Sequence, residues 1–166
     1  MEEKPRYLGL TELVEEISHQ LAWAPLKPNY RSKEGLKGTI ASVVKEFLET
    51  KLRPLDLRYE VWQRRVEEEG GIEPLYVFGA DFAPDLVIDI EDEPTLAIVV
   101  TLVKKDLDLP VKLGCAIGQA LLYCHQYPAI ITLILHLGKD QEYKHWKDRE
   151  IQQDLWSTHK IRLVFR

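Results

Sequence analysis

The amino-acid sequence predicts an α/β domain in which a mixed β-sheet is flanked by helices. Two helical patterns open the chain, short apolar runs alternate with helical patterns in its second half, and one run is apolar on both faces. With 166 residues, of which 45% are hydrophobic and 30% charged, the chain can bury one core. We therefore expect a single domain over residues 1–166.

Two helices are expected before the first strand. Apolar residues recur at helical spacing between Leu10 and Leu21, with Thr11 as the expected N-cap, and the prolines that follow end this helix. This part, residues 1–30, forms an N-terminal helical extension. The second helix is predicted over 32–52, where apolar residues again lie three and four apart.

Three strands are expected next. Alternating side chains predict a strand over 57–66 that is exposed on one side, and an acidic, glycine-containing turn follows. A second strand is predicted over 86–90 and a polar connection over 91–95. The run 96–103 is apolar on both faces, which is typical of a central strand covered on both sides.

Helices and strands alternate in the remainder of the chain. The strand–helix–strand unit from 96 to 137 predicts a right-handed parallel crossover. Residues 138–166 follow this unit in the sequence and complete the domain. In chain order, we expect a helix over 111–126, a strand over 129–137, a helix over 147–157 and a strand over 161–165.

Charge and cysteine content narrow the class of protein. The chain has 27 acidic and 22 basic residues, a net charge of −5, which argues against a generic polycation but allows a local basic patch. No apolar stretch approaches the roughly 20 residues of a membrane span, and no secretory signal is visible. Cys115 and Cys124 lie about 13 Å apart on opposite faces of one predicted helix, so no disulfide between them is expected. These features favour a cytoplasmic protein without a membrane partner.

Several motifs follow one another in an order that resembles a known family. They are Glu34 on the second helix, Pro84-Asp85 before a strand, the buried strand 97–104, and Gln119 with Tyr123 on the next helix. This order is similar to the PD-(D/E)XK nuclease superfamily, in its RecB-like branch, over residues 32–137. The resemblance implies a restriction-endonuclease-like fold, Mg²⁺-dependent cleavage of a phosphodiester, and a catalytic set comprising Asp85, Glu34, Gln119 and Tyr123.

The chain departs from this family where an acid-x-lysine pair should stand. Val99 takes the place of the metal-binding acid and Thr101 that of the lysine. Valine cannot coordinate a cation, and Asp85 alone is a poor Mg²⁺ site, because this ion gives up its hydration reluctantly. We therefore expect a degenerate active site, with no cofactor, or Mg²⁺ if the site is active.

Alternatives remain open for the site. Lys104 could take the place of the missing lysine. Side chains alternate along a strand, so Lys104 would point to the face opposite that of Thr101, and a β-bulge would be needed to bring it to the same face. Glu91 or Glu93 could supply the acid if the strand is shifted. Taken singly, Asp85, Glu34 and the Gln119/Tyr123 pair also have structural explanations: a turn residue, a first-turn acid and helix packing.

A basic and aromatic cluster suggests a nucleic-acid surface, comprising Arg58, Trp62, Arg64 and Arg65. An edge strand protected by charge explains the same residues equally well. The sequence thus predicts a catalytically degenerate nuclease-like protein that binds DNA or a protein partner. The partner could be a second copy of the chain, which would make a homodimer. An active Mg²⁺-dependent endonuclease with relocated residues and a protein-interaction scaffold are the alternatives.

Overall fold

The computed structural model describes residues 9–26, 32–63, 72–138 and 149–166, and within them it is an α/β structure. The helices are α1 (Leu10–Trp23), α2 (Lys33–Leu52), α3 (Leu109–Tyr123) and α4 (Arg149–His159), with short 3₁₀ turns at Arg53–Leu55 and Asp106–Asp108. The strands are β1 (Tyr59–Gln63), β2 (Leu75–Val77), β3 (Ala80–Phe82), β4 (Leu86–Ile90), β5 (Glu93–Val103), β6 (Ile130–His136) and β7 (Ile161–Phe165).

Five of the strands form one mixed sheet in the order β1-β4-β5-β6-β7. β1, β4 and β5 pair antiparallel, whereas β5, β6 and β7 pair parallel. β5 is therefore the central strand on which the two halves meet, as its apolar run predicts. The parallel relation of β5 and β6 confirms the predicted strand–helix–strand crossover, with α3 as its helix.

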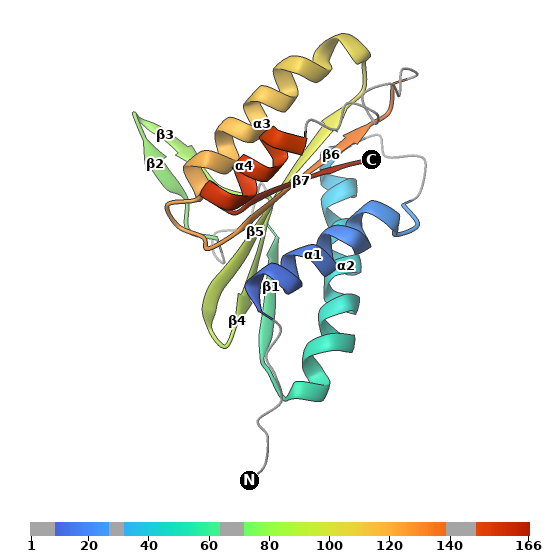
Figure 1. Cartoon of the computed structure of the whole chain (residues 1–166), viewed down its shortest axis with the longest axis vertical. Helices are drawn as coiled ribbons and strands as arrows, with labels where there is room; N and C mark the ends of the chain where they lie inside the picture. Colours follow the sequence, from blue (N-terminus) through green and yellow to red (C-terminus); the bar gives the residue numbers. More distant parts are fainter. Residues whose placement is uncertain (1–8, 27–31, 64–71, 139–148) are drawn as a thin grey trace.

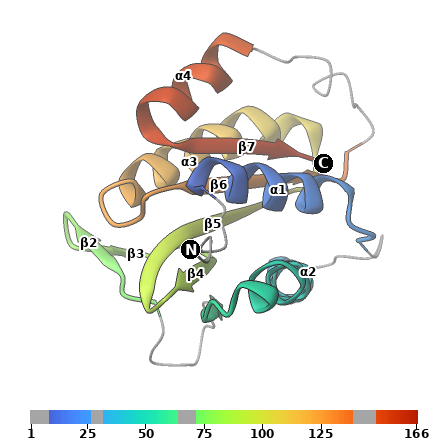
Figure 2. The same cartoon turned by 60° about the horizontal axis from the view of Figure 1, so that its bottom comes forward.

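The helices lie on both faces of this sheet (Figures 1 and 2). α1 and α2 cover one face, where alternate β5 residues such as Ile98 and Val100 join the larger apolar cluster. α3 and α4 lie over the other face, where Val99 and Tyr123 belong to a second cluster. The mixed sheet flanked by helices is thus confirmed, and successive residues of β5 face opposite helix layers.

The helix boundaries follow local capping chemistry. Ser32 caps α2, because its side-chain oxygen accepts a hydrogen bond from the Gly35 N–H at 3.2 Å. The expected cap of α1 is wrong, since Thr11 lies inside the helix and Gly9 occupies the N-cap without a side-chain bond. α1 ends at Trp23, just before Ala24-Pro25.

The connection between β4 and β5 is shorter than predicted. β5 begins at Glu93, so the turn consists of Glu91 and Asp92 alone, and both have positive φ, at 53° and 65°. Two positive φ values are typical of a tight two-residue hairpin turn. Arg58, the residue before β1, holds this turn. Its N–H donates to Glu91 at 2.6 Å, and its guanidinium group pairs with Asp92 at 2.8 Å.

The sequence-based prediction missed a separate two-stranded sheet formed by β2 and β3. It projects beside the main sheet, and β3 leads directly to the Pro84-Asp85 segment (Figure 1). Its turn is Phe78-Gly79, with φ of 49° and 81°. A bulky residue at positive φ is uncommon, which is why the sequence gives little sign of this hairpin.

Other boundaries shift by a few residues. α3 begins at Leu109 and ends at Tyr123 rather than spanning 111–126, so Cys124 follows the helix instead of lying within it. Cys115 and Cys124 are free thiols, which confirms the expected absence of a disulfide between them. Residues 64–66, part of the predicted first strand, lie outside the described residues. No helix in the described ranges is long and apolar enough to cross a membrane.

The Phe78-Gly79 turn yields a stability prediction. Phe78 is fully exposed, so its ring buries nothing, while its left-handed backbone carries strain. Phe78→Asn is expected to raise the free energy of unfolding by about 1 kcal/mol, since asparagine tolerates this conformation and Asn-Gly suits the turn. Urea denaturation measures the change, and an unchanged or lower stability would contradict the assigned turn.

Candidate functional site

The carboxylate of Asp85 lies at the junction of β4 and β5, and it is buried. Pro84 and Asp85 precede β4, and the Asp85 N–H donates to the Ile98 carbonyl at 3.0 Å. One carboxylate oxygen, Oδ2, accepts the Val100 N–H at 2.7 Å. Both main chain and side chain of Asp85 are therefore tied to β5.

The other oxygen of Asp85 is held by two lysines from α2. Oδ1 lies 3.0 Å from Lys33 Nζ and 3.1 Å from Lys37 Nζ. Lys37 also contacts Glu34 Oε1 at 2.7 Å, so one ammonium group bridges two carboxylates. The structure thus brings Glu34 and Asp85 together, as the resemblance implies, but with lysine ammonium groups at their meeting point.

The two lysines differ in burial. The side chain of Lys37 is only 7% exposed, whereas that of Lys33 is 44% exposed. Burial lowers the pKa of Lys37, but the hydrogen bonds and charges of Glu34 and Asp85 outweigh it, so that this pKa lies above its ordinary value of 10.5. Lys37 is consequently a charged member of the buried cluster at neutral pH.

Sequence reasoning missed both lysines, although one signal was available. On α2, Lys37 shares the apolar helix face with Ala41, Val44 and Leu48, which follow it at spacings of four, seven and eleven residues and are buried. A charged side chain on a buried face requires a partner of opposite charge. Its partner, Asp85, is far along the chain, so spacing could not identify it.

The contacts of Asp85 bear on its possible role as a metal ligand. Its Oδ1 faces two positive charges and its Oδ2 already accepts a main-chain hydrogen bond. A divalent cation at Oδ1 would have to displace or approach two ammonium groups. Among the described residues, no group of three or more His, Cys, Asp or Glu side chains is arranged to hold a metal ion.

The positions that replace the family's acid and lysine lie in different surroundings. Val99 is buried in the cluster that also contains Val87 and Tyr123, on the face covered by α3. Thr101 is half-buried and lines a separate pocket. Tyr123 is therefore a core residue, and an acid at position 99 would have to replace a side chain packed among apolar groups.

That separate pocket, the lysine pocket, has a volume of about 340 Å³ and lies between β5 and α3. None of its lining residues is acidic. Lys112 is fixed at its wall, since its Nζ donates to the Leu102 carbonyl at 2.9 Å. The pocket is lined by Lys33, Thr101, Leu102, Lys104, Lys112, Cys115, Ala116 and Gln119.

The lysine pocket unites several residues that the sequence singled out. Gln119 and Thr101 face it, and so does Lys104, which follows the end of β5. Lys33 joins it to the Asp85 cluster, because this one side chain contacts Asp85 and lines the pocket. Three positive charges therefore surround a cavity large enough for a phosphate group.

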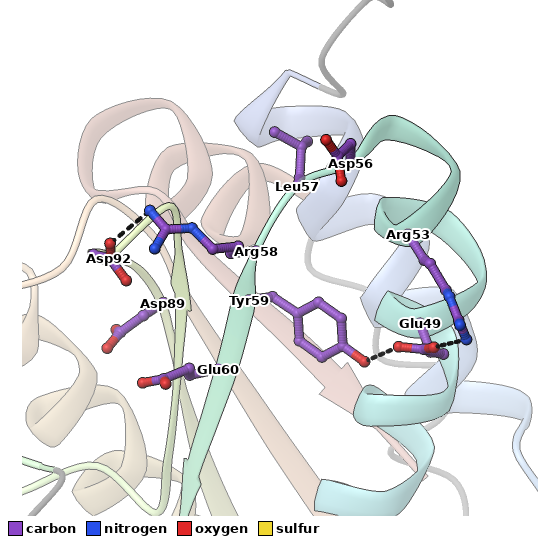
Figure 3. A pocket seen from close by; sticks show the side chains of 9 residues that line it. All are labelled: Glu49, Arg53, Asp56, Leu57, Arg58, Tyr59, Glu60, Asp89 and Asp92. Carbon is purple, nitrogen blue, oxygen red and sulfur yellow. Dashed lines mark hydrogen bonds and ion pairs between the residues drawn. The ribbon is translucent and has the colours of Figure 1, made fainter.

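A second pocket, of about 550 Å³, lies where β1 and β4 meet the end of α2. Its lining has five carboxylates and two guanidinium groups, and most of these are paired. Figure 3 shows Arg58 against Asp92, and Tyr59 against Glu49. The Tyr59 hydroxyl donates to Glu49, and the two oxygens are 2.6 Å apart. That hydrogen bond raises the pKa of Tyr59. The pocket is lined by Glu49, Arg53, Asp56, Leu57, Arg58, Tyr59, Glu60, Asp89 and Asp92.

The predicted nucleic-acid cluster lies partly at this second pocket. Arg58 is paired with Asp92, and the Trp62 indole donates to Asp89 at 2.8 Å. The described part of this cluster is thus compensated by carboxylates, which does not favour phosphate binding here. Arg64 and Arg65 lie outside the described residues.

Comparisons of the chain with protein-family models, curated proteins and solved structures found no match. The nuclease resemblance therefore rests on the order of the residues in the sequence alone.

The burial difference between the two lysines predicts unequal effects on stability. Lys37→Met leaves Asp85 buried with one exposed cationic partner, and we expect a loss of about 3 kcal/mol in the free energy of unfolding. Lys33→Met removes a half-exposed pair and should cost less than about 1 kcal/mol. Urea denaturation of the two matched variants tests this, and equal losses would show that Lys37 does not hold the cluster.

The raised pKa of Lys37 also predicts a pH dependence. A lysine whose folded pKa exceeds its unfolded value adds stability that is complete below pH 10.5 and is lost as the pH rises through the folded value. The stability difference between wild type and Lys37→Met should therefore be constant below pH 10.5 and shrink as the pH rises above it. Denaturation midpoints over a pH series measure it, and a difference that stays constant through the whole series would contradict the shift.

Proposed function

We propose that this protein is a non-catalytic, nuclease-like DNA-binding protein that holds a backbone phosphate in the lysine pocket. The observation that carries the proposal is the pairing of Asp85 with two lysine ammonium groups beside a pocket lined by three lysines. The pairing of Asp85 with the lysines concerns catalysis, and the pocket concerns binding.

The state of Asp85 supports the absence of catalysis. Phosphodiester cleavage with Mg²⁺ requires carboxylates that are free to coordinate the ion. Asp85 and Glu34 instead share the Lys37 ammonium, and Val99 is a buried apolar residue. In this arrangement the positive charge that compensates the carboxylates is supplied by the chain itself.

The lysine pocket supports binding of a phosphate. Lysine is a compact cation that binds phosphate oxygens, and Gln119 and Thr101 add neutral hydrogen-bonding groups to the same lining. The chain as a whole is acidic, with a net charge of −5, so this local concentration of positive charge stands out from its surroundings. A nucleic-acid backbone approaching the molecule is favoured here rather than at the acidic second pocket.

The position of Lys37 and Lys33 also favours a second candidate, an active endonuclease with relocated groups. The two lysines supply, from α2, the cation that Thr101 does not supply from β5. An acid that replaces Val99 would still be required from another segment. Cleavage of supercoiled plasmid in Mg²⁺ or Mn²⁺ distinguishes the two: the proposal expects none, and nicking that Asp85→Asn abolishes would establish the active enzyme instead.

The binding prediction concerns Lys104 and Lys112. Lys104→Gln combined with Lys112→Gln should weaken binding to a fluorescent DNA duplex. The slope of log K against log salt should fall in magnitude by about two, because each substitution removes one contact between a lysine and a phosphate. Fluorescence anisotropy over a salt series measures both quantities. Lys33 is left intact because it also contacts Asp85.

The matched control is Lys45→Gln with Lys51→Gln on α2, which removes the same charge away from the lysine pocket. It should change binding little. If both double variants lose affinity equally, the effect is one of net charge and the pocket is not the binding site. If the wild type binds no DNA even at low salt, the scaffold alternative replaces the proposal.

A further inference from the structure

The hairpin of β2 and β3 carries two aromatic side chains on its solvent side. Phe78 is fully exposed, at 104%, and Tyr76 is 71% exposed. The tyrosine side chain extends toward the turn, because its hydroxyl would lie 3.8 Å from a Cβ atom added at Gly79. In Figures 1 and 2 the hairpin stands at one side of the molecule, beside the five-stranded sheet. Both aromatic residues are therefore presented to solvent at the turn or close to it.

The opposite side of the hairpin anchors it to the domain. Leu75 and Phe82 are cross-strand partners and half-buried, and Phe82 packs against the apolar cluster under α3. Side chains alternate along a strand, so Tyr76 is directed to the other face, where its cross-strand partner is the exposed Asp81. The hairpin is thus held by one face and offers the other.

Folding alone does not account for the residue at position 78. The backbone of Phe78 has a φ of 49°, a conformation that bulky residues rarely adopt, and its ring buries nothing. A strained backbone position that holds a large exposed side chain is typical of a functional position. The feature to be explained is therefore a planar apolar ring that is kept in water.

The form of this surface favours a nucleobase over a protein surface. A stable protein interface has an apolar core of many residues, whereas the neighbours of Phe78 at the tip, Gly79, Ala80 and Asp81, are exposed and small or charged. A base needs only one ring, because the flat face of any base stacks on it. Asp81 repels phosphate but can accept a hydrogen bond from the amino group of a base. The outer face of the hairpin thus suits bases rather than a sugar-phosphate backbone.

The hairpin is directly connected to the residues beside the lysine pocket. β3 leads to Asp85, whose carboxylate contacts Lys33 in the lining of that pocket. Phe78 precedes Asp85 by seven residues, so the two Cα atoms are at most about 25 Å apart. A DNA strand rises about 3.4 Å per nucleotide, so a strand of about ten nucleotides is long enough to contact both places.

We propose that the β2–β3 hairpin is a base-stacking site, in which Phe78 and Tyr76 stack on unpaired bases of the DNA whose phosphate lies in the lysine pocket. This inference rests on the proposed function and adds to it a preference for unpaired bases. In an intact duplex the base faces cover one another, and separating them costs free energy. The protein should therefore bind a single strand more tightly than a duplex of the same sequence.

Fluorescence anisotropy with a labelled oligonucleotide of about ten nucleotides, single-stranded or paired with its complement, tests the preference. Phe78→Leu should lower the affinity for the single strand about tenfold and leave that for the duplex unchanged, because leucine is apolar but has no flat ring. Phe78→Tyr keeps a ring and should bind like the wild type. The matched control is Trp23→Leu, which removes a ring that is 75% exposed on α1 and should change neither affinity.

A single strand that contains 2-aminopurine reports stacking directly, because its fluorescence is quenched when the base stacks on an aromatic ring. Wild type and Phe78→Tyr should quench it, and Phe78→Leu should not. Duplex binding with no preference for the single strand, or equal single-strand affinities of wild type and Phe78→Leu, overturns the stacking site and leaves the proposed function standing. Equal losses in Phe78→Leu and Trp23→Leu also overturn it. A wild type that binds neither DNA overturns both.

Discussion

A buried carboxylate needs a positive charge or hydrogen-bond donors beside it, and Asp85 is such a carboxylate in this fold. Its side chain is removed from water at the junction of β4 and β5, where an unpaired charge would cost several kcal/mol. Lys37 meets it from α2, and the Val100 N–H meets it from β5. A helix, the start of one strand and the centre of another are thereby fixed relative to one another, and the first helix layer takes its position on the sheet from this contact as well as from apolar packing.

The same requirement connects the buried cluster to the surface. Lys33 contacts Asp85 with its ammonium group while its half-exposed side chain lines the lysine pocket. A ligand in that pocket and the Asp85 carboxylate would share one cation. The two features are therefore electrostatically coupled, although one is closed to solvent and the other open to it.

The sequence predicts the fold well where apolar patterns are strong. β4 and β7 have the predicted bounds because both are short apolar runs beside turn residues of positive φ: β4 ends before Glu91, and β7 begins after Lys160. Ser32 likewise marks the start of α2. The β2–β3 hairpin was missed, because its strands have three residues each and Phe78 occupies a position that favours asparagine or glycine. Such a conformation depends on the surrounding structure rather than on local preference.

The candidate site was only partly predictable, for a similar reason. Asp85, Glu34 and Gln119 were named as candidates because a resemblance orders them along the chain. Lys37 and Lys33 were not found, because their meaning depends on a partner brought close by the topology of the sheet. The lysine pocket likewise draws its charges from α2, the end of β5 and the start of α3, which only the folded chain brings together.

The Lys112 ammonium joins the first turn of α3 to the Leu102 carbonyl near the end of β5. One wall of the lysine pocket is thus fastened to the strand that carries Thr101 on the opposite wall. The width of the pocket is therefore set by the way the crossover helix packs on its own sheet.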